Sequence, residues 1–266
     1  MTEISDKSFD ISRTANYTLS IRKSPNGFCF AVFDEEKKLV HFLLSKKDYG
    51  SDIQLLHKEF RQVFFCHDDN RYTLLPASLF NPELKADYWR LNFGEETAAD
   101  TLRSEVIPLT DIVTLYPSDE KDLKNLKECF PIIQTVHRQT VQIAVATMLS
   151  KRNIGQQLFL HFAEKERFDA ILMEKGRLIL ANTYERRSAD EFLFHVLNLF
   201  DQMKLDQYQT EVVLEGPNDG SEKQLLSQYV QSVQEKSMTL REISTAFERI
   251  KEYGSTTFLN IPYIIS

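Results

Sequence analysis

The chain has 266 residues, of which 42% are hydrophobic and 27% charged, a composition typical of a soluble globular protein of one large or two ordinary domains. Its net charge of −7 argues against a protein that binds nucleic acid by neutralising phosphates, because that function needs a clustered basic face and the basic residues here stand in isolated pairs. The opening stretch, MTEISDKSFDIS, lacks the apolar core of a secretory signal, and no apolar run approaches the roughly 20 residues of a membrane helix. We therefore expect no membrane contact. The three cysteines contain no CxxC pair and suit a reducing compartment, so a cytoplasmic location is expected.

The first part of the chain predicts a three-stranded meander. Residues 1–14 are polar and predict a loose lead-in. Residues 17–44 then read strand, turn, strand, turn, strand, where the Pro-Asn-Gly sequence within 24–27 favours the first tight turn and the charged run 34–38 the second. Both alternating faces of the middle strand are apolar, which indicates a sheet covered on both sides.

The region after this meander predicts further elements up to about residue 150. Helices are expected at 51–62 (capped by Ser51), 76–80, 118–130 and 138–149, and strands at 63–66, 71–75, 88–93, 111–116 and 132–136. Residues 81–108 form a less regular insertion. The strand–helix alternation after residue 110 predicts parallel strand pairing.

The second half of the chain repeats the first meander. In residues 157–183 the pattern recurs, so that Phe28 matches Phe168 and Asp34 matches Glu174, each pair 140 positions apart. The later elements are a turn at 174–177, a helix opened by the capping pair Ser188 and Glu191, a strand at 211–215, helices at 221–233 and near 241–253, and an apolar tail at 257–265. The boundary is expected at 153–155, which gives domains at 15–153 and 154–266.

This order of elements resembles a known superfamily. Three meandering strands and a helix followed by strand–helix–strand–helix resemble a ribonuclease-H-like unit, and two such units in tandem resemble the actin, Hsp70 and sugar-kinase superfamily. Over residues 15–260 the chain is similar to a bacterial family of unknown function with an actin-like ATPase fold. The similarity is carried by YTLSIRKSPNGFCFAVFD, VTLYPSDEKDLKNLKECFPIIQTVHRQT, the second meander and EVVLEGPNDG. The resemblance implies an α/β fold of two ribonuclease-H-like units, each a mixed sheet flanked by helices.

The resemblance also implies where a nucleotide would bind and shows that the chemistry there is incomplete. In the superfamily the first hairpin of each half supplies an Asp and glycines for phosphate, and carboxylates position Mg²⁺ and water. Here the first strand, 17–22, has no carboxylate, and the second meander offers His161, Glu164 and Lys165 instead. Gly216 and Gly220 stand where the adenosine turn would be, although Glu215 and Asp219 flank it unfavourably for phosphate. A plain strand-to-helix turn that uses glycine's backbone freedom explains the same residues.

Other groups of polar residues have a structural interpretation beside a chemical one. The densest set of metal-ligand types is His57, Cys66, His67, Asp68 and Asp69, but adjacent residues on a strand point to opposite faces, so a turn at 67–70 is favoured. Ser20 and Lys23 imitate a Ser–Lys nucleophile, yet on a strand they also face opposite sides. Three histidines, His137, His161 and His195, are interpreted as hydrogen-bonded structural residues, and the cysteines as buried packing residues.

The sequence thus favours a non-catalytic, cytoplasmic interaction or scaffold protein with no catalytic residue and no metal ligand. Its partner would be another protein or a second copy of the chain, and the tail at 258–265 would supply a contact patch if it did not dock on its own body. The alternative is a nucleotide-binding protein or weak ATPase that holds ATP and Mg²⁺ through Gly216 and Gly220, with a carboxylate from Asp34, Asp111 or Glu215. A module for anionic ligands or nucleic acid is a third reading, which the net charge of −7 opposes.

Overall fold

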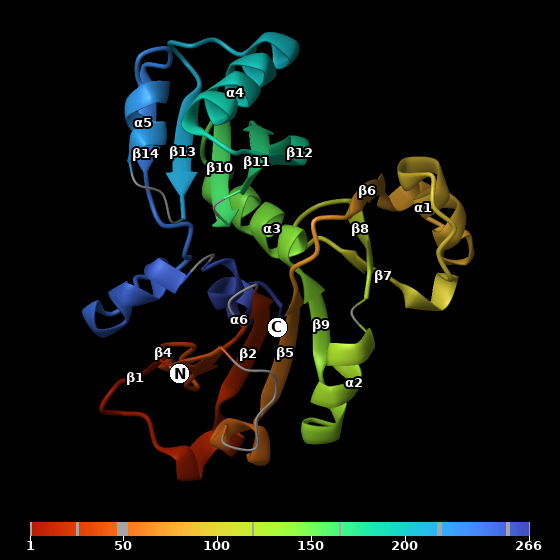
Figure 1. Ribbon diagram of the computed structural model, residues 1–266, viewed down its shortest axis with the longest axis vertical. Coiled ribbons are helices and arrows are strands. Elements are labelled where there is room, and N and C mark those ends of the chain that lie inside the picture. The colour runs from red at the N-terminus through yellow and green to blue at the C-terminus, as the bar shows by residue number, and fades with distance from the viewer. Residues whose placement is uncertain are drawn as a thin grey trace. The chain divides into compact units, whose positions relative to one another are not determined.

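The computed structural model describes residues 2–24, 27–46, 53–118, 120–164, 166–216, 220–253 and 256–265. The chain divides into two compact units (Figure 1). Unit 1 contains Met1–Gln142, Arg241–Glu248 and Thr257–Ser266, and unit 2 contains Ile143–Leu240 and Arg249–Thr256. The division expected from the sequence, 15–153 and 154–266, differs from this one in two ways: residues 143–153 belong to unit 2, and two C-terminal segments join unit 1.

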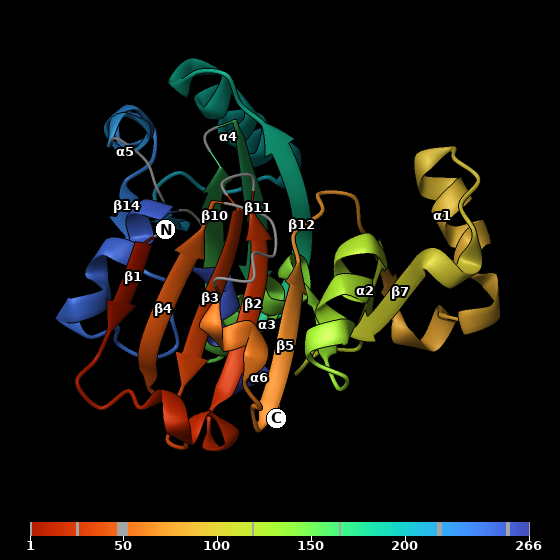
Figure 2. The same cartoon turned by 60° about the horizontal axis from the view of Figure 1, so that its bottom comes forward.

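Unit 1 is built on a six-stranded mixed sheet in the order β1-β4-β3-β2-β5-β9. Figure 2 shows β1, β4, β3, β2 and β5 of this sheet. Its strands are β1 (Thr2–Ser5), β2 (Thr18–Ser24), β3 (Gly27–Phe33), β4 (Leu39–Ser45), β5 (Gln62–His67) and β9 (Gln134–His137). Strands β2, β3 and β4 pair antiparallel, which confirms the first meander. Strand β5 then pairs parallel with β2, and β9 parallel with β5. The middle of the first tight turn, Pro25 and Asn26, lies outside the described residues.

Two predictions for the first part of unit 1 are wrong. Residues 1–14 are not a loose lead-in, because β1 pairs antiparallel with β4 and a 3₁₀ helix, η1 (Ile11–Asn16), follows it. Pairing with β1 satisfies backbone groups that β4 would otherwise leave open at the sheet edge. The helix expected at 51–62 is only a 3₁₀ turn, η2 (Gln54–His57), and Ser51 lies outside the described residues. The apolar side chains there are already buried within this one turn, so a longer helix adds little.

Helices α2 (Glu120–Cys129) and α3 (Arg138–Ser150) confirm the helices expected at 118–130 and 138–149. Leu123 and Leu126 of α2 pack into the core of the sheet together with Leu19, Phe30 and Phe65. Strand β9 connects the two helices and pairs with β5, which is the parallel arrangement expected for 132–136.

The region between β5 and α2 is an insertion with its own small sheet in the order β6-β8-β7. Its elements are β6 (Thr73–Pro76), the 3₁₀ turns η3 (Ala77–Leu79), η4 (Pro82–Leu84) and η5 (Ala99–Thr101), helix α1 (Lys85–Phe93), and strands β7 (Leu102–Val106) and β8 (Ile112–Pro117). The strand expected at 88–93 is wrong, because Trp89 and Phe93 stack one helical turn apart at 4.1 Å between ring centroids. The parallel pairing expected for 111–116 is wrong too, since β8 pairs antiparallel with both neighbours.

Unit 2 repeats the plan of unit 1 in a five-stranded sheet, β12-β11-β10-β13-β14. Its elements are β10 (Gln156–Glu164), β11 (Arg167–Glu174), β12 (Arg177–Glu185), α4 (Ala189–Met203), β13 (Glu211–Glu215), α5 (Ser221–Leu226) and β14 (Ser232–Glu235). The meander β10-β11-β12 is antiparallel, and β13 and β14 add parallel strands. The order matches β4-β3-β2-β5-β9 of unit 1, which confirms the duplication.

Details of unit 2 confirm one helix prediction and correct another. The Ser188 side chain accepts a hydrogen bond from the N–H of Glu191 at the start of α4, as the capping pair predicts. Helix α4 covers one face of the sheet through Phe192, Val196 and Phe200 (Figure 1). The helix expected at 221–233 instead ends at Leu226, because the following residues form β14 on the free side of β13.

The apolar tail is docked within unit 1. It forms η7 (Thr257–Asn260) and α6 (Ile261–Ile264) after η6 (Thr245–Tyr253), and both η7 and α6 contact β2. Phe258, Leu259 and Ile261 are buried, and the Tyr263 hydroxyl donates to the carbonyl of Lys37. The tail is therefore not an open patch for a partner. Among the residues described above, no helix is long and apolar enough to cross a lipid bilayer.

Candidate functional site

The most unusual polar cluster of unit 1 lies at one edge of its large sheet. Arg22 near the end of β2 is paired in register with Cys66 of β5, and Asp68 follows β5 directly. Arg138 is the first residue of α3, immediately after β9. Because β2, β5 and β9 are parallel, the carboxyl ends of all three strands lie along the same side of the sheet. Open α/β sheets bind their ligands at the carboxyl ends of their strands.

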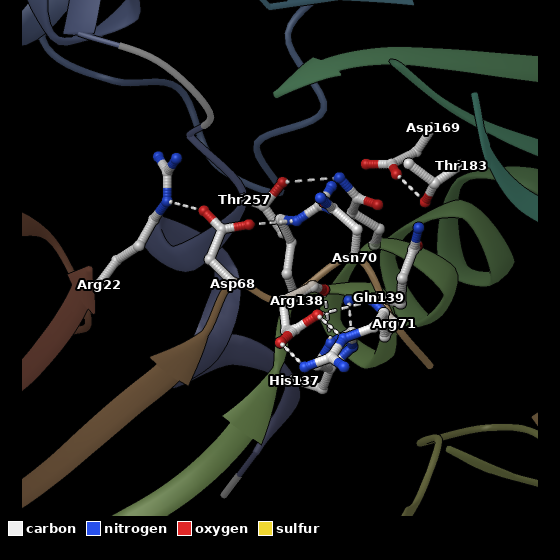
Figure 3. A network of polar contacts seen from close by, with 12 residues as sticks. Arg22, Asp68, Asn70, Arg71, His137, Arg138, Gln139, Asp169, Thr183 and Thr257 are labelled. Carbon is white, nitrogen blue, oxygen red and sulfur yellow. Dashed lines mark hydrogen bonds and ion pairs between the residues drawn. The ribbon is translucent and has the colours of Figure 1, made fainter. Parts of the chain in front are cut away.

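Asp68 lies between two arginines at this edge (Figure 3). Arg22 Nε donates to Asp68 Oδ2 over 2.7 Å, and Arg138 Nε lies 2.5 Å from Asp68 Oδ1. All three side chains are withdrawn from solvent, with exposed fractions of 2%, 1% and 7% for Arg22, Arg138 and Asp68. Each carboxylate oxygen of Asp68 therefore has its own guanidinium partner.

The electrostatics of this cluster keep Asp68 ionised. Burial by itself would raise the pKa of the Asp68 carboxyl, but the positive charges of Arg22 and Arg138 outweigh burial and lower that pKa to about 2. The same contact acts on Arg22, where burial opposes the charge but Asp68 raises the pKa of the guanidinium. Asp68 and Arg22 are therefore both charged at neutral pH.

The residues after Asp68 are attached to the beginning of α3. His137 Nε2 donates to the carbonyl of Asp69 at 2.9 Å, and the N–H of Gln139 donates to His137 Nδ1 at 3.2 Å. Arg138 Nη2 donates to the Asn70 side chain at 3.3 Å. Burial and the adjacent Arg138 lower the pKa of His137 to about 3, so this ring is neutral and is held in one tautomer.

A second acid, which is half-buried, connects the insertion to the same place. Glu105 of β7 accepts from the N–H of His137 at 2.7 Å through Oε1 and from the Tyr116 hydroxyl at 3.1 Å through Oε2. Burial raises the pKa of the Glu105 carboxyl to about 7, and the hydrogen bonds it accepts only partly offset this. The neighbouring Cys66 thiol also has a raised pKa because of burial, which disfavours the reactive thiolate.

The glycines predicted to receive a nucleotide have a structural role in unit 2. Gly216 directly follows β13 and has φ +108°, and a Cβ atom at this position would lie 2.3 Å from the carbonyl oxygen of Phe162 in β10. Gly220 has φ +83° with open space around it, and it precedes α5, a helix of only six residues. Residues 217–219, including Asp219, lie outside the described residues. Close approach of two strands thus accounts for Gly216 without a ligand.

Of the three carboxylates considered as catalytic alternatives, Glu215 and Asp34 take part in structural contacts and Asp111 lies in the insertion. Glu215 pairs with His161 and accepts from the Thr256 hydroxyl at 2.8 Å and the Met238 N–H at 3.1 Å. Burial would raise the pKa of Glu215, but His161 and these hydrogen bonds hold it below its ordinary value. Asp34 accepts backbone N–H groups in the turn between β3 and β4, and Asp111 precedes β8 in the insertion. Within the described parts of the chain, no three or more His, Cys, Asp or Glu side chains are grouped as metal ligands would be.

The structure places the ligand-type residues at 57–69 in three different settings: a 3₁₀ turn, the end of β5 and the ion-pair cluster. His57 is an exposed residue of the turn η2, while His67 packs its ring against Phe65 at 4.7 Å between centroids. The turn predicted at 67–70 starts where the structure ends β5, at His67. The role of Asp68 at the centre of two ion pairs was not predicted. The sequence offered one signal for it: Asp68 directly follows a buried strand, while Arg22 lies near the end of another strand and Arg138 at the start of a helix.

The strand order of the two units and their duplication define the actin-like ATPase fold. The chain is similar to a solved protein of that fold and of unknown function from Bacteroides thetaiotaomicron VPI-5482, with 18% identity, a TM-score of 0.75, and coverage of 92% of this chain and 98% of that chain. It is also similar to a chain of the PilM-PilN type IV pilus biogenesis complex, with 9% identity, a TM-score of 0.57, and coverage of 93% and 97%. The chain belongs to the family described as protein of unknown function DUF3822, whose model matches residues 6–233. Among curated proteins, none matches the chain.

Proposed function

We propose that this protein is a non-catalytic interaction or scaffold protein built on the actin-like ATPase fold. The observation that carries the proposal is the closed ion-pair cluster of Arg22, Asp68 and Arg138 at the carboxyl edge of the unit 1 sheet. At such an edge an ATPase requires carboxylate oxygens that can bind Mg²⁺ and orient water. Here the carboxylate is buried between two positive charges.

Binding of a divalent cation at Asp68 would carry a large cost in free energy. Both Oδ atoms face a guanidinium, so a metal ion would have to displace Arg22 or Arg138 from a buried ion pair. Breaking a buried ion pair by removing one partner costs about 3–5 kcal/mol, because the remaining charge is left uncompensated. The cluster therefore favours a structural role, in which the arginines and Asp68 hold β2, β5 and α3 together.

A fold without its chemistry still presents surfaces for other proteins. The PilM-PilN type IV pilus biogenesis complex, one chain of which has a similar fold, is an assembly of proteins. We extend this mode of action to the present chain and expect a protein partner, or a second copy of the chain, in the cytoplasm. The three cysteines, none of which forms a disulfide, are in keeping with that compartment.

The direct test is thermal melting of the full chain with Mg²⁺-ATP, Mg²⁺-GTP and the diphosphates, together with an assay for phosphate release. A ligand at about 100 times its Kd adds about 2.7 kcal/mol to the free energy of unfolding, which raises Tm by several degrees. We expect no rise in Tm and no hydrolysis. A rise with one nucleotide would overturn the proposal and favour the alternative, a nucleotide-binding protein that uses the turn at Gly216 and Gly220.

A further inference from the structure

The two units differ in how the outer strand of each meander ends its sheet. In unit 1 this strand is β4, and β1 pairs with it antiparallel from His41 to Leu44. In unit 2 the corresponding strand is β12, which stands first in the order β12-β11-β10-β13-β14 (Figure 1). Within the described residues no strand pairs with the outer side of β12. Such an edge strand offers its backbone N–H and C=O groups to a strand of another molecule.

The duplication aligns β4 and β12 residue by residue. Each of the two ladders has one register shift, where an extra residue lies in the outer strand, Val40 in β4 and Ile179 in β12. These two residues are 179 − 40 = 139 positions apart, which sets the alignment of the residues that follow them. The stretch of β4 that β1 covers, 41–44, therefore corresponds to 180–183 of β12.

One pair of corresponding residues differs in chemistry. Leu43 of β4 pairs with Glu3 of β1, is 4% exposed and belongs to the hydrophobic core of unit 1. Its counterpart in β12 is Asn182, which is exposed. Asn182 lies opposite Ala170 of the unit 2 core, so its side chain is on the face of the sheet that α4 covers. The covered edge thus has a leucine where the open edge has a polar side chain.

Asn182 lies between two apolar side chains on this face. Leu180 and Tyr184, its neighbours two positions away, both pack against the unit 2 core. A strand added beside β12 would cover these side chains and the Asn182 amide together. Burial of an amide without new hydrogen bonds is unfavourable, and a polar residue that points inward on an edge strand is one way in which proteins prevent such pairing.

The Asn182 side chain also engages a backbone group of the open edge. Its Oδ1 accepts a hydrogen bond from the N–H of Thr183 at 2.9 Å. Successive N–H groups of a strand point alternately to its two sides, and the N–H of Arg186 donates to the carbonyl of Glu166 on the β11 side. The N–H of Thr183, three positions earlier, therefore points to the open side. A covering strand would have to displace the Asn182 side chain from it.

We propose that Asn182 prevents β12 from pairing with β12 of a second copy of the chain. Identical edge strands that meet across a two-fold axis run antiparallel, which is the sense in which β1 covers β4. A second copy therefore offers the kind of strand that the counterpart edge in unit 1 accepts. The inference goes beyond the proposed function, because it concerns one edge of unit 2 whichever partner the protein has.

The test replaces Asn182 in the full chain and measures self-association by sedimentation velocity over a wide range of protein concentration. Asn182→Leu gives β12 the side chain that β4 has at Leu43, and Asn182→Asp keeps a polar acceptor beside Thr183. The matched control is Asn198→Leu, which adds the same apolar side chain at an exposed position of α4. We expect the Kd of the Asn182→Leu dimer to be at least about tenfold below that of wild type, and no change in the other two variants.

Hydrogen exchange locates the contact. The N–H of Ala181 points to the same side of β12 as that of Thr183, because the two residues are two positions apart. In Asn182→Leu both amides should exchange more slowly as the protein concentration rises, whereas in wild type their exchange should not depend on concentration. Thermal melting of each variant checks that it is folded.

Four results would overturn the proposal. Two concern the amount of association: Asn182→Leu associates no more than wild type, or Asn198→Leu or Asn182→Asp associates as strongly as Asn182→Leu. The other two concern its place: Asn182→Leu associates without slower exchange at Ala181 and Thr183, or wild type itself shows slower exchange there at high concentration.

Discussion

Arg22 Nε donates to Asp68 Oδ2 over 2.7 Å, although the two residues are 46 positions apart in sequence. The contact joins the ends of two neighbouring parallel strands, and Arg138 completes it from the start of α3. A buried charge is tolerated only when it is paired and hydrogen-bonded. The three residues therefore depend on one another, and removing the single carboxylate affects both arginines.

We predict that Asp68→Asn destabilises unit 1 by about 3–5 kcal/mol, because it leaves two buried guanidinium groups with a neutral partner. Trp89 is the only tryptophan of the chain and belongs to unit 1, so urea unfolding followed by its fluorescence measures the loss. The matched control is Asp69→Asn, since Asp69 is 36% exposed and its side chain contacts Arg71 at 3.4 Å. A change in Asp68→Asn as small as that of the control would show that the cluster does not stabilise unit 1.

The lowered pKa of Asp68 predicts an acid-dependent loss of stability. A carboxyl group whose pKa is lower in the folded than in the unfolded chain stabilises the folded chain at pH values above its unfolded-state pKa. This stabilisation is lost as the pH falls through the folded-state pKa. For Asp68 the window runs from its ordinary value of 3.8 down to about 2, and the loss is about 2 kcal/mol. We expect the difference in stability between wild type and Asp68→Asn to shrink over this window. A constant difference in urea titrations from neutral pH down to about 2 would contradict the assigned ion pairs.

The parts of the fold that could be predicted are those with local signals. The two meanders follow from alternating apolar residues and turn sequences such as Lys175-Gly176, where both residues have positive φ. The start of α4 follows from Ser188 and Glu191 in the same way. Each of these signals depends on residues only a few positions apart, so neighbouring sequence is enough.

The parts that could not be predicted depend on distant residues. Tyr88, Trp89 and Phe93 favour a strand by propensity, but packing of Trp89 against Leu102 and Leu115 selects a helix. In the same way, β14 exists because β13 offers an open edge. The candidate site requires three segments to meet, and no spacing in the sequence indicates that Arg22 and Arg138 share Asp68.

The raised pKa of Glu105 predicts the opposite pH dependence. A carboxyl whose folded pKa is above its unfolded value stabilises the folded chain at low pH, and this contribution is lost as pH rises from its ordinary 4.5 through about 7. Glu105→Gln mimics the neutral form, so we expect it to be more stable than wild type at pH 8 and to lose this advantage below pH 5. Glu120→Gln, at an exposed surface pair with Arg103, is the control. Thermal melts at both pH values measure the effect, and an equal effect of Glu105→Gln at the two values would refute it.

Gly216 and Gly220 allow strand packing and backbone strain to be measured separately. Both have positive φ, so an alanine is strained at either position, but only at Gly216 would its Cβ meet the Phe162 carbonyl at 2.3 Å. We expect Gly216→Ala to destabilise unit 2 by at least about 2 kcal/mol more than Gly220→Ala, because β10 and β13 would be forced apart. Hydrogen exchange of the amides in β10 and β13 measures this without any ligand. Equal protection in the two variants would mean that Gly216 is not required for packing, and its role as a nucleotide-binding residue would then regain support.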